Sequence, residues 1–107
     1  MATANDVRKI ALALEGTTEA PHFDRFAFKV VRTYATLASD GKSLNIKLEA
    51  GEQELKCEMS PEAFKRVPNA WGDQGWTTVE LKAIKVKELQ AVLAMAWEQA
   101  RFKRKRK

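Results

Sequence analysis

The chain has 107 residues, a hydrophobic fraction of 45% and a charged fraction of 31%. These values are typical of one folded domain, expected over residues 1–100, and they exclude an intrinsically disordered chain. No apolar run reaches the about 20 residues of a membrane helix, and no signal peptide is expected at the N-terminus. Cys57 is the only cysteine, which excludes an internal disulfide and is compatible with the cytoplasm, the expected location.

Charge is unevenly distributed along the chain. Six of the 19 basic residues lie in the C-terminal tail, residues 101–107, and all 14 acidic residues precede this tail. Residues 1–100 therefore carry a net charge of −1, although the whole chain carries +5. The basic character belongs to the tail rather than to a face of the domain that composition alone can detect. A short basic tail of this kind is attracted to polyanions.

The beginning of the chain predicts a helix. Thr3 is suited to cap its N-terminus, and Asp6, three residues later, completes an approximate capping box. The apolar residues that follow are spaced i, i+3, i+4 and i+7, which places them on one helical face; they are Val7, Ile10, Ala11 and Leu14. Gly16 is a suitable stop, and the segment from Thr17 to Arg25, which contains Pro21, is expected to be a loop.

Three short runs then predict an antiparallel meander. They are Phe26 to Val31, Tyr34 to Ala38 and Ser43 to Leu48. The second and third are joined through Asp40-Gly41, a pair typical of a hairpin because glycine tolerates the positive φ that such turns need. In the third run, apolar residues alternate with Asn45 and Lys47, which indicates a strand with one buried and one wet face.

The following segments leave alternatives open. Glu52 to Met59 is rich in helix formers and favours a short helix with Leu55 and Met59 facing inward. The alternation of Leu55, Cys57 and Met59 would also fit an extended segment. Ala63 to Val67 is either a short strand or a single helical turn. Pro68 to Gly75 is expected to be a turn-rich loop.

The end of the chain predicts a strand and a long helix. Trp76 to Leu81 is rich in β-branched and aromatic residues, which favours a strand. From about Val86, apolar residues follow the helical period over three turns; they are Leu89, Val92, Leu93, Ala96, Trp97 and Ala100. Together these elements predict an α+β fold, in which an antiparallel sheet of the meander and the late strands has N- and C-terminal helices packed on one face.

Several short motifs stand in a characteristic order. They are Leu12 to Gly16 at the end of the first helix, Phe28 to Val30, Tyr34 to Leu37 and Leu44 to Lys47 in the meander, Gln74 to Leu81 in the late strand, and Ala96-Trp97 in the last helix. In this order they resemble the MmcQ/YjbR-like family of small bacterial proteins over nearly the whole chain. The resemblance implies a fold similar to CyaY/frataxin and secretion chaperones. It also implies a DNA-binding role of the double-wing type, with hairpins as the wings.

The chain departs from the family's pattern at two places. Family members often have an aromatic residue other than Trp at the position of Trp97. Their segment before the late strand often carries Lys and sometimes His, where this chain has Asn69 to Gln74. If that segment contacts DNA in relatives, its loss of positive charge weakens the contact here.

No set of residues predicts catalysis or metal binding. His22 lies near Asp24 and could act as a general base, but no nucleophile accompanies it, so a loop or packing role is favoured. Cys57, between a lysine and a glutamate, is expected to be a buried or half-buried thiol rather than a reactive one. One His and one Cys cannot form a Cys/His metal site, and the glycines are too scattered for a phosphate loop. The sequence predicts a protein that is not an enzyme and has no cofactor.

The three tryptophans are candidates for stacking on a base. Trp97 lies on the apolar face of its helix and is expected in the core. Trp76 opens a strand and could face either way. Trp71 lies in a loop and is the expected contact residue; the competing interpretation is a plug at the edge of the core.

Basic residues form the second group of candidates, because they could bind phosphate. In the body they are Lys29 and Lys47 on the predicted wet face, Arg32 and Lys42 at strand connections, and Lys65 and Arg66 before the Trp71 loop. The competing interpretation is ordinary solvated charge. In the tail they include Lys103, Arg104, Lys105, Arg106 and Lys107. Six phosphate contacts by the tail would give a salt slope of about −5 without reading sequence, and a solubility role is the alternative.

Two functions remain after these exclusions. The first is a non-catalytic cytoplasmic domain that binds DNA through the sheet and hairpin cations and the tail, with Trp71 as an optional stacking group. The alternative is a protein-binding adaptor, or chaperone-like module, that uses the Trp71–Trp76 loop and the open sheet face. Salt-dependent binding by the body favours DNA, whereas an exposed apolar patch of several hundred Å² without flanking cations favours the adaptor.

Overall fold

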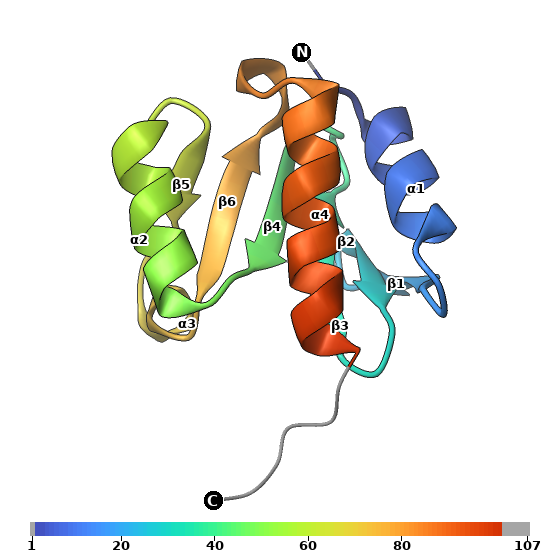
Figure 1. The fold of residues 1–107 in the computed structure, drawn as a ribbon. Coiled ribbons are helices and arrows are strands. Elements are labelled where there is room, and N and C mark those ends of the chain that lie inside the picture. Colours follow the sequence, from blue (N-terminus) through green and yellow to red (C-terminus); the bar gives the residue numbers. More distant parts are fainter. Residues whose placement is uncertain (1, 102–107) are drawn as a thin grey trace, which may run out of the picture.

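The computed structural model describes residues 2–101. Within this range the helices are α1 (Ala4–Ala13), α2 (Ala50–Met59), α3 (Ala70–Asp73) and α4 (Val86–Ala100), with a 3-10 turn, η1, at Leu81–Ala83 (Figure 1). The strands are β1 (Thr18–His22), β2 (Arg25–Lys29), β3 (Thr33–Ala38), β4 (Ser43–Lys47), β5 (Phe64–Arg66) and β6 (Trp76–Glu80).

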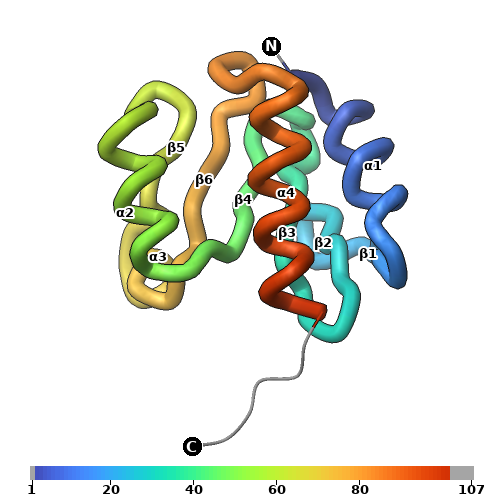
Figure 2. Tube along the Cα trace, viewed as in Figure 1, coloured from blue at the N-terminus to red at the C-terminus, as the bar shows by residue number. Residues whose placement is uncertain are grey.

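The six strands form one antiparallel sheet in the order β1-β2-β3-β4-β6-β5. The helices α1, α2 and α4 lie on the same side of this sheet and leave its other side uncovered (Figures 1 and 2). α4 packs against α1, β3 and β4, and α2 packs on β5. The predicted α+β fold, with the terminal helices on one face of an antiparallel sheet, is confirmed.

The predicted capping box of α1 is present. The Thr3 hydroxyl accepts a hydrogen bond from the Asp6 N–H at 3.2 Å, and the Asp6 carboxylate accepts one from the Thr3 N–H at 2.9 Å. Val7 and Ala11 are buried on the face that the spacing predicted. After the helix ends, the Glu15 carbonyl accepts a hydrogen bond from the Trp97 indole N–H at 2.9 Å. The two terminal helices are therefore tied to each other.

The loop predicted from Thr17 to Arg25 is wrong, because most of it is strand β1 and Arg25 begins β2. β1 is an edge strand, paired only with β2. Pro21 is tolerated there because one side of an edge strand makes no ladder hydrogen bonds. The Arg8 side chain of α1 holds this edge by donating to Glu19 at 2.9 Å.

α2 confirms the favoured helical alternative, but its predicted inward face is wrong. Leu55 and Met59 are 48% and 73% exposed, whereas Gln53 is only 4% exposed. The Gln53 side-chain amide donates to the carbonyl oxygens of Gly72 at 2.9 Å and Trp76 at 3.1 Å. A polar residue is buried at this position because two backbone carbonyl groups face it and accept its hydrogen bonds. The spacing of apolar residues within α2 cannot predict these carbonyl groups.

Replacing Gln53 with methionine is expected to lower the free energy of unfolding by about 1–3 kcal/mol. The change keeps the length of the side chain but removes two hydrogen bonds, each with a net value of about 0.5–1.5 kcal/mol. Urea unfolding followed by tryptophan fluorescence measures the change. Gln90→Met, on the exposed side of α4, is the matched control and is expected to have little effect. Equal stabilities for the two variants would contradict the role given to the Gln53 amide.

The segment before β6 is more regular than its turn-rich sequence predicted. Of the two alternatives for Ala63 to Val67, the strand is correct, since β5 pairs with β6. The loop predicted from Pro68 to Gly75 contains the one-turn helix α3, and the Asn69 side chain accepts from the Trp71 N–H at 2.9 Å. This short helix determines where Trp71 lies.

The core lies between the helices and the sheet. α4 contributes the predicted residues Leu89, Val92, Leu93 and Ala96. The largest fully buried side chains of the sheet are Phe28, Tyr34, Leu37, Leu44, Ile46 and Phe64. Trp97 packs against this core and is only partly buried. None of the helices in residues 2–101 combines the length and apolarity that a membrane-spanning segment requires.

Candidate nucleic-acid interface

The side of the sheet away from the helices is called the open face below. Side chains alternate across each strand, and the register places Ala27 opposite Thr36 and Asn45 opposite Thr78 on this face. The Thr78 hydroxyl donates to the Asn45 side chain at 2.7 Å, as expected for neighbours on one face. By the same alternation, the charged strand residues of the open face are Arg25, Lys29, Lys47, Lys65 and one acid, Glu80.

Arg25 belongs to this face and was missed from the sequence, because it fell in the expected loop. Its side chain lies across β3 and donates to the Thr36 hydroxyl and to the Thr36 carbonyl, both at 2.9 Å. Partial burial lowers the pKa of Arg25, while the nearby Asp24 and Asp40 oppose this shift. An arginine remains charged at neutral pH. The alternation of Arg25, Ala27 and Lys29 was the signal that could have placed it.

The two lysines predicted on the wet face, Lys29 and Lys47, do lie on the open face, and Lys65 lies there with them. Lys29 ends β2 and is exposed, and Lys65, in the centre of β5, is exposed as well. Lys47 ends β4 opposite Trp76 of β6 and is partly buried. The three lysines therefore span the sheet from β2 to the β5 edge, with Arg25 at the other end of β2.

Arg32 supports the fold rather than the open face. It lies between β2 and β3, and its guanidinium donates to the Gln99 carbonyl at 2.8 Å, in the last turn of α4. A cation is favourable there because the carbonyl end of a helix is partly negative. Arg32 and Lys47 also line a hollow of about 610 Å³, together with Glu49 and Asp73. The two acids offset the positive charge of this hollow.

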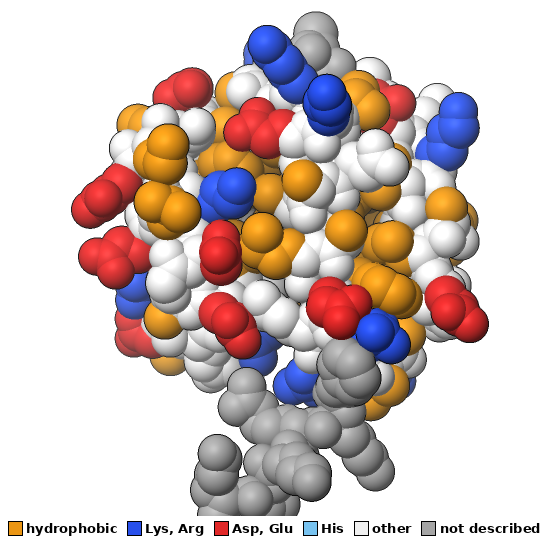
Figure 3. Space-filling model, viewed as in Figure 1, with side chains coloured by type: hydrophobic (Ala, Val, Ile, Leu, Met, Phe, Trp, Pro, Cys, Tyr) orange, Lys and Arg blue, Asp and Glu red, His pale blue; other side chains and the backbone are white. Residues whose placement is uncertain are grey.

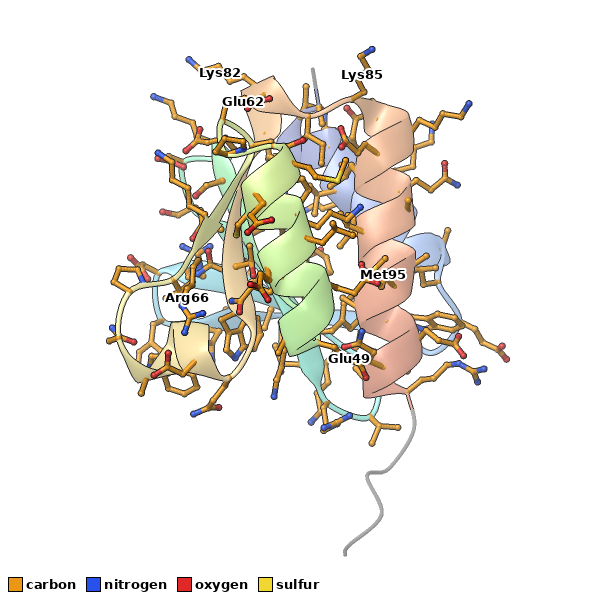
Figure 4. The ribbon with its side chains drawn as sticks, turned by 60° about the vertical axis from the view of Figure 1, so that its left-hand side comes forward. Glu49, Glu62, Arg66, Lys82, Lys85 and Met95 are labelled. Atoms are coloured by element: carbon orange, nitrogen blue, oxygen red, sulfur yellow. The ribbon has the colours of Figure 1, made fainter. Side chains whose placement is uncertain are left out.

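The structure separates the two other predicted body cations from this group. Lys42 lies near η1, at the end of the molecule opposite the α4 C-terminus. Its backbone carbonyl accepts a hydrogen bond from the Leu81 N–H. Arg66 alternates with Lys65 in β5, so it lies on the helix side, and its guanidinium pairs with Asp73. Figure 4 shows Arg66 beside α2, and Lys82 and Lys85 near the start of α4. On the helix side as a whole, acidic and basic side chains are interspersed (Figure 3).

Trp71, the expected contact residue, is exposed and does not plug the edge of the core. Trp71 is 58% exposed on α3. Trp76 is partly buried, and its pairing with Lys47 places it on the open face. Trp97 instead has its ring 5.0 Å from the Arg101 guanidinium. Trp71 and Trp76 therefore remain candidates for a contact, and Trp97 has a structural role.

The two residues considered for catalysis have ordinary surroundings. Burial raises the pKa of the Cys57 thiol, so less of the reactive thiolate forms at neutral pH. His22 is exposed, and its ring meets that of Phe23 edge-on at 4.9 Å. In residues 2–101 no group of three or more His, Cys, Asp or Glu side chains could hold a metal ion. The tail candidates Lys103, Arg104, Lys105, Arg106 and Lys107 lie outside the described residues.

These features define a class: a small α+β domain whose antiparallel sheet is covered by helices on one side and carries mainly basic charge on the other. The model of the YjbR family matches residues 12–99, so the chain belongs to the YjbR family, as its sequence motifs predicted. Its fold is similar to the crystal structure of Deinococcus radiodurans protein DR2400, which has a DUF419 domain, with a TM-score of 0.79. The two share 22% identity over 91% of this chain and 77% of that chain. No curated protein matches the chain.

Proposed function

We propose that this chain is a cytoplasmic DNA-binding module without catalytic activity, and that the open face and the basic tail contact the phosphate backbone. The observation that carries the proposal is the charge of the open face, where the strands place four cations and one acid. Residues 1–100 have a net charge of −1, so this concentration of positive charge is a property of the face and not of the whole body. The double-wing role that the family resemblance implies points in the same direction.

The spacing of these cations suits a phosphate backbone. Arg25 and Lys29 lie four residues apart on β2, which corresponds to about 13 Å along a strand. The two cations are therefore far enough apart to contact different phosphates of one DNA strand. Four phosphate contacts by the face would give a salt slope of about −4, and the tail would increase its magnitude.

Neutralising the open face is expected to weaken DNA binding and reduce its salt dependence. In the full chain, the triple variant Lys29→Gln, Lys47→Gln, Lys65→Gln should reduce the magnitude of the salt slope by about 3. Fluorescence anisotropy of a labelled duplex across a salt series measures both affinity and slope. The matched control is Lys82→Gln, Lys85→Gln, Lys87→Gln, which removes the same charge from exposed positions near the start of α4.

The two triple variants separate a binding face from an effect of net charge. Equal losses in both would contradict the proposal, because only total charge would then matter. A third variant, with the basic residues of the tail replaced by glutamine, measures the share of the tail. If this variant alone loses binding, the tail binds polyanions non-specifically. The folded body would then not bind DNA and would have another function.

That other function would be the adaptor role, which one observation favours. Trp71 presents 58% of its surface at the end of the sheet where β6 begins, and exposed aromatic residues often anchor protein contacts. Leu55 and Met59 are also exposed, one helical turn apart on α2. A protein partner would bind with little dependence on salt and would lose affinity in a Trp71→Ala variant.

A further inference from the structure

The turn between β1 and β2 carries an unusual residue. His22 and Arg25 form the last pair of the two strands, so Phe23 and Asp24 alone make the turn. Phe23 has a φ of 58° and is 94% exposed. Phe28 and Phe64 are buried, and Phe26 is packed against the core. Phe23 therefore contributes nothing to the core of the described chain.

Neither the positive φ of Phe23 nor the exposure of its ring stabilises the fold. A two-residue hairpin turn with positive φ at its first position favours glycine, because a side chain there meets the backbone. For a bulky residue, positive φ is a true outlier. An exposed phenyl ring also gains nothing from the hydrophobic effect. Strained backbone at an exposed position is a reason to look for a contact that the ring makes with another molecule.

The position of the ring relative to the open face indicates what that molecule is. Both neighbours of the turn, His22 and Arg25, belong to the open face by register. The Phe23 ring lies against the His22 ring, 4.9 Å between centroids and 73° between planes. Arg25 is fixed on Thr36 by two hydrogen bonds. An apolar ring thus projects beside Arg25, whose charge is partly offset by Asp24 and Asp40, and Lys29 lies on the same face at the other end of β2.

We propose that Phe23 is a base-stacking residue, which places its ring against an exposed base while the cations of the open face hold the adjoining phosphates. The inference rests on the proposed function, since it names the part of the nucleic acid that the same face would contact. Aromatic residues on nucleic-acid-binding proteins stack on unpaired bases, and apolar side chains also enter a base step that is easily unstacked. The preferred ligand is DNA with an accessible base.

The test compares Phe23→Gly with Phe23→Trp in the full chain. The probes are a labelled 20-base-pair duplex, the same duplex with two adjacent central mismatches, and the single strand. We expect the glycine variant to lose about 5- to 100-fold in affinity for the mismatched and single-stranded probes, with less loss on the intact duplex. The salt slope should stay unchanged, because no charge is removed. The tryptophan variant should bind as the wild type does.

Two controls separate stacking from damage to the fold. Glycine relieves the positive φ at position 23, so the thermal midpoint of Phe23→Gly should equal or exceed that of the wild type. Met59→Ala removes another exposed apolar side chain, 73% exposed on α2, and should bind all three probes normally. Loss of affinity together with a lower thermal midpoint would indicate a damaged hairpin and would overturn the inference.

The outcomes also separate this inference from the proposed function. If the wild type binds and Phe23→Gly binds equally well to every probe, Phe23 does not stack and the open face still binds DNA. A smaller salt slope in Phe23→Gly would mean that the turn positions the cations, which again overturns stacking. If the wild type binds none of the probes above the level that its tail alone explains, the proposed function and this inference fall together.

Discussion

Replacing Gly75 with alanine is expected to lower the free energy of unfolding by about 3 kcal/mol or more. Gly75 has a φ of +107°, and an added Cβ would overlap the carbonyl oxygen of Leu48. Left-handed backbone costs an L-residue about 1–2 kcal/mol, and a steric overlap in a packed site costs about 1–3 kcal/mol more. The overlap is between the Cβ, which has no freedom to rotate away, and a backbone carbonyl, so no change of rotamer can relieve it.

The damage should reach the candidate interface. The Gly75 carbonyl accepts hydrogen bonds from the Leu48 N–H at 2.9 Å and from the Thr77 hydroxyl at 3.1 Å. These bonds join the end of β4 to the start of β6, where Lys47 and Trp76 are paired. A shift of Gly75 would therefore move Lys47 and Trp76, which both lie on the open face.

Urea unfolding followed by circular dichroism measures this cost, and Gly51→Ala is the matched control. Gly51 lies in α2, and an added Cβ would meet nothing within 4 Å. Alanine is favoured over glycine in a helix by about 1 kcal/mol, so this control should become more stable. If Gly75→Ala costs less than about 1 kcal/mol, the close approach between Gly75 and Leu48 does not exist in solution.

Replacing Phe64 with alanine is expected to cost about 3–5 kcal/mol, the usual range for a buried phenylalanine. Phe64 is 1% exposed, and it pairs with Val79 on the helix side of the sheet. β5 has only three residues, and α2 packs on it. The Phe64 side chain is therefore the main apolar anchor of this edge, and its removal should loosen α2 and Lys65 together.

Met59→Ala on α2 is the control for Phe64→Ala in the same unfolding experiment. Met59 is 73% exposed, so its truncation should change stability by no more than about 0.5 kcal/mol. A large cost for Met59→Ala with a small one for Phe64→Ala would reverse the orientation of α2 described above. It would support instead the inward face predicted from the sequence, with Met59 and Leu55 in the core.

Local signals in the sequence predicted several elements correctly. The capping box of Thr3 and Asp6, the turn at Asp40-Gly41 and the period of α4 each depend on residues close to one another in the chain. Gly41 does have positive φ, at 72°, as a hairpin glycine should. The family motifs added the order of the elements. The α+β fold, the family and two of the open-face cations, Lys29 and Lys47, followed from this information.

Other features depend on which strands become neighbours in the sheet, and local sequence patterns do not predict these neighbours. Pro21 suggested a loop because a proline is excluded from the middle of a sheet, but β1 lies at the edge, where one side needs no hydrogen-bond partner. Gln53 is buried because the α3–β6 connection brings two carbonyl groups to α2. The apolar spacing of α2 favoured Leu55 and Met59 instead, since spacing reports apolar neighbours and not backbone acceptors.

The candidate site shows the same division. The sequence by itself determined which residues are basic and, from alternation, that Lys29 and Lys47 lie on a wet face. Only the tertiary structure decided that Arg25 and Lys65 join them, that Arg66 lies on the opposite side, and that Phe23 projects from the end of the open face. A one-residue change of register moves a side chain to the other face of a sheet, and register is fixed by packing between strands that are far apart in the sequence.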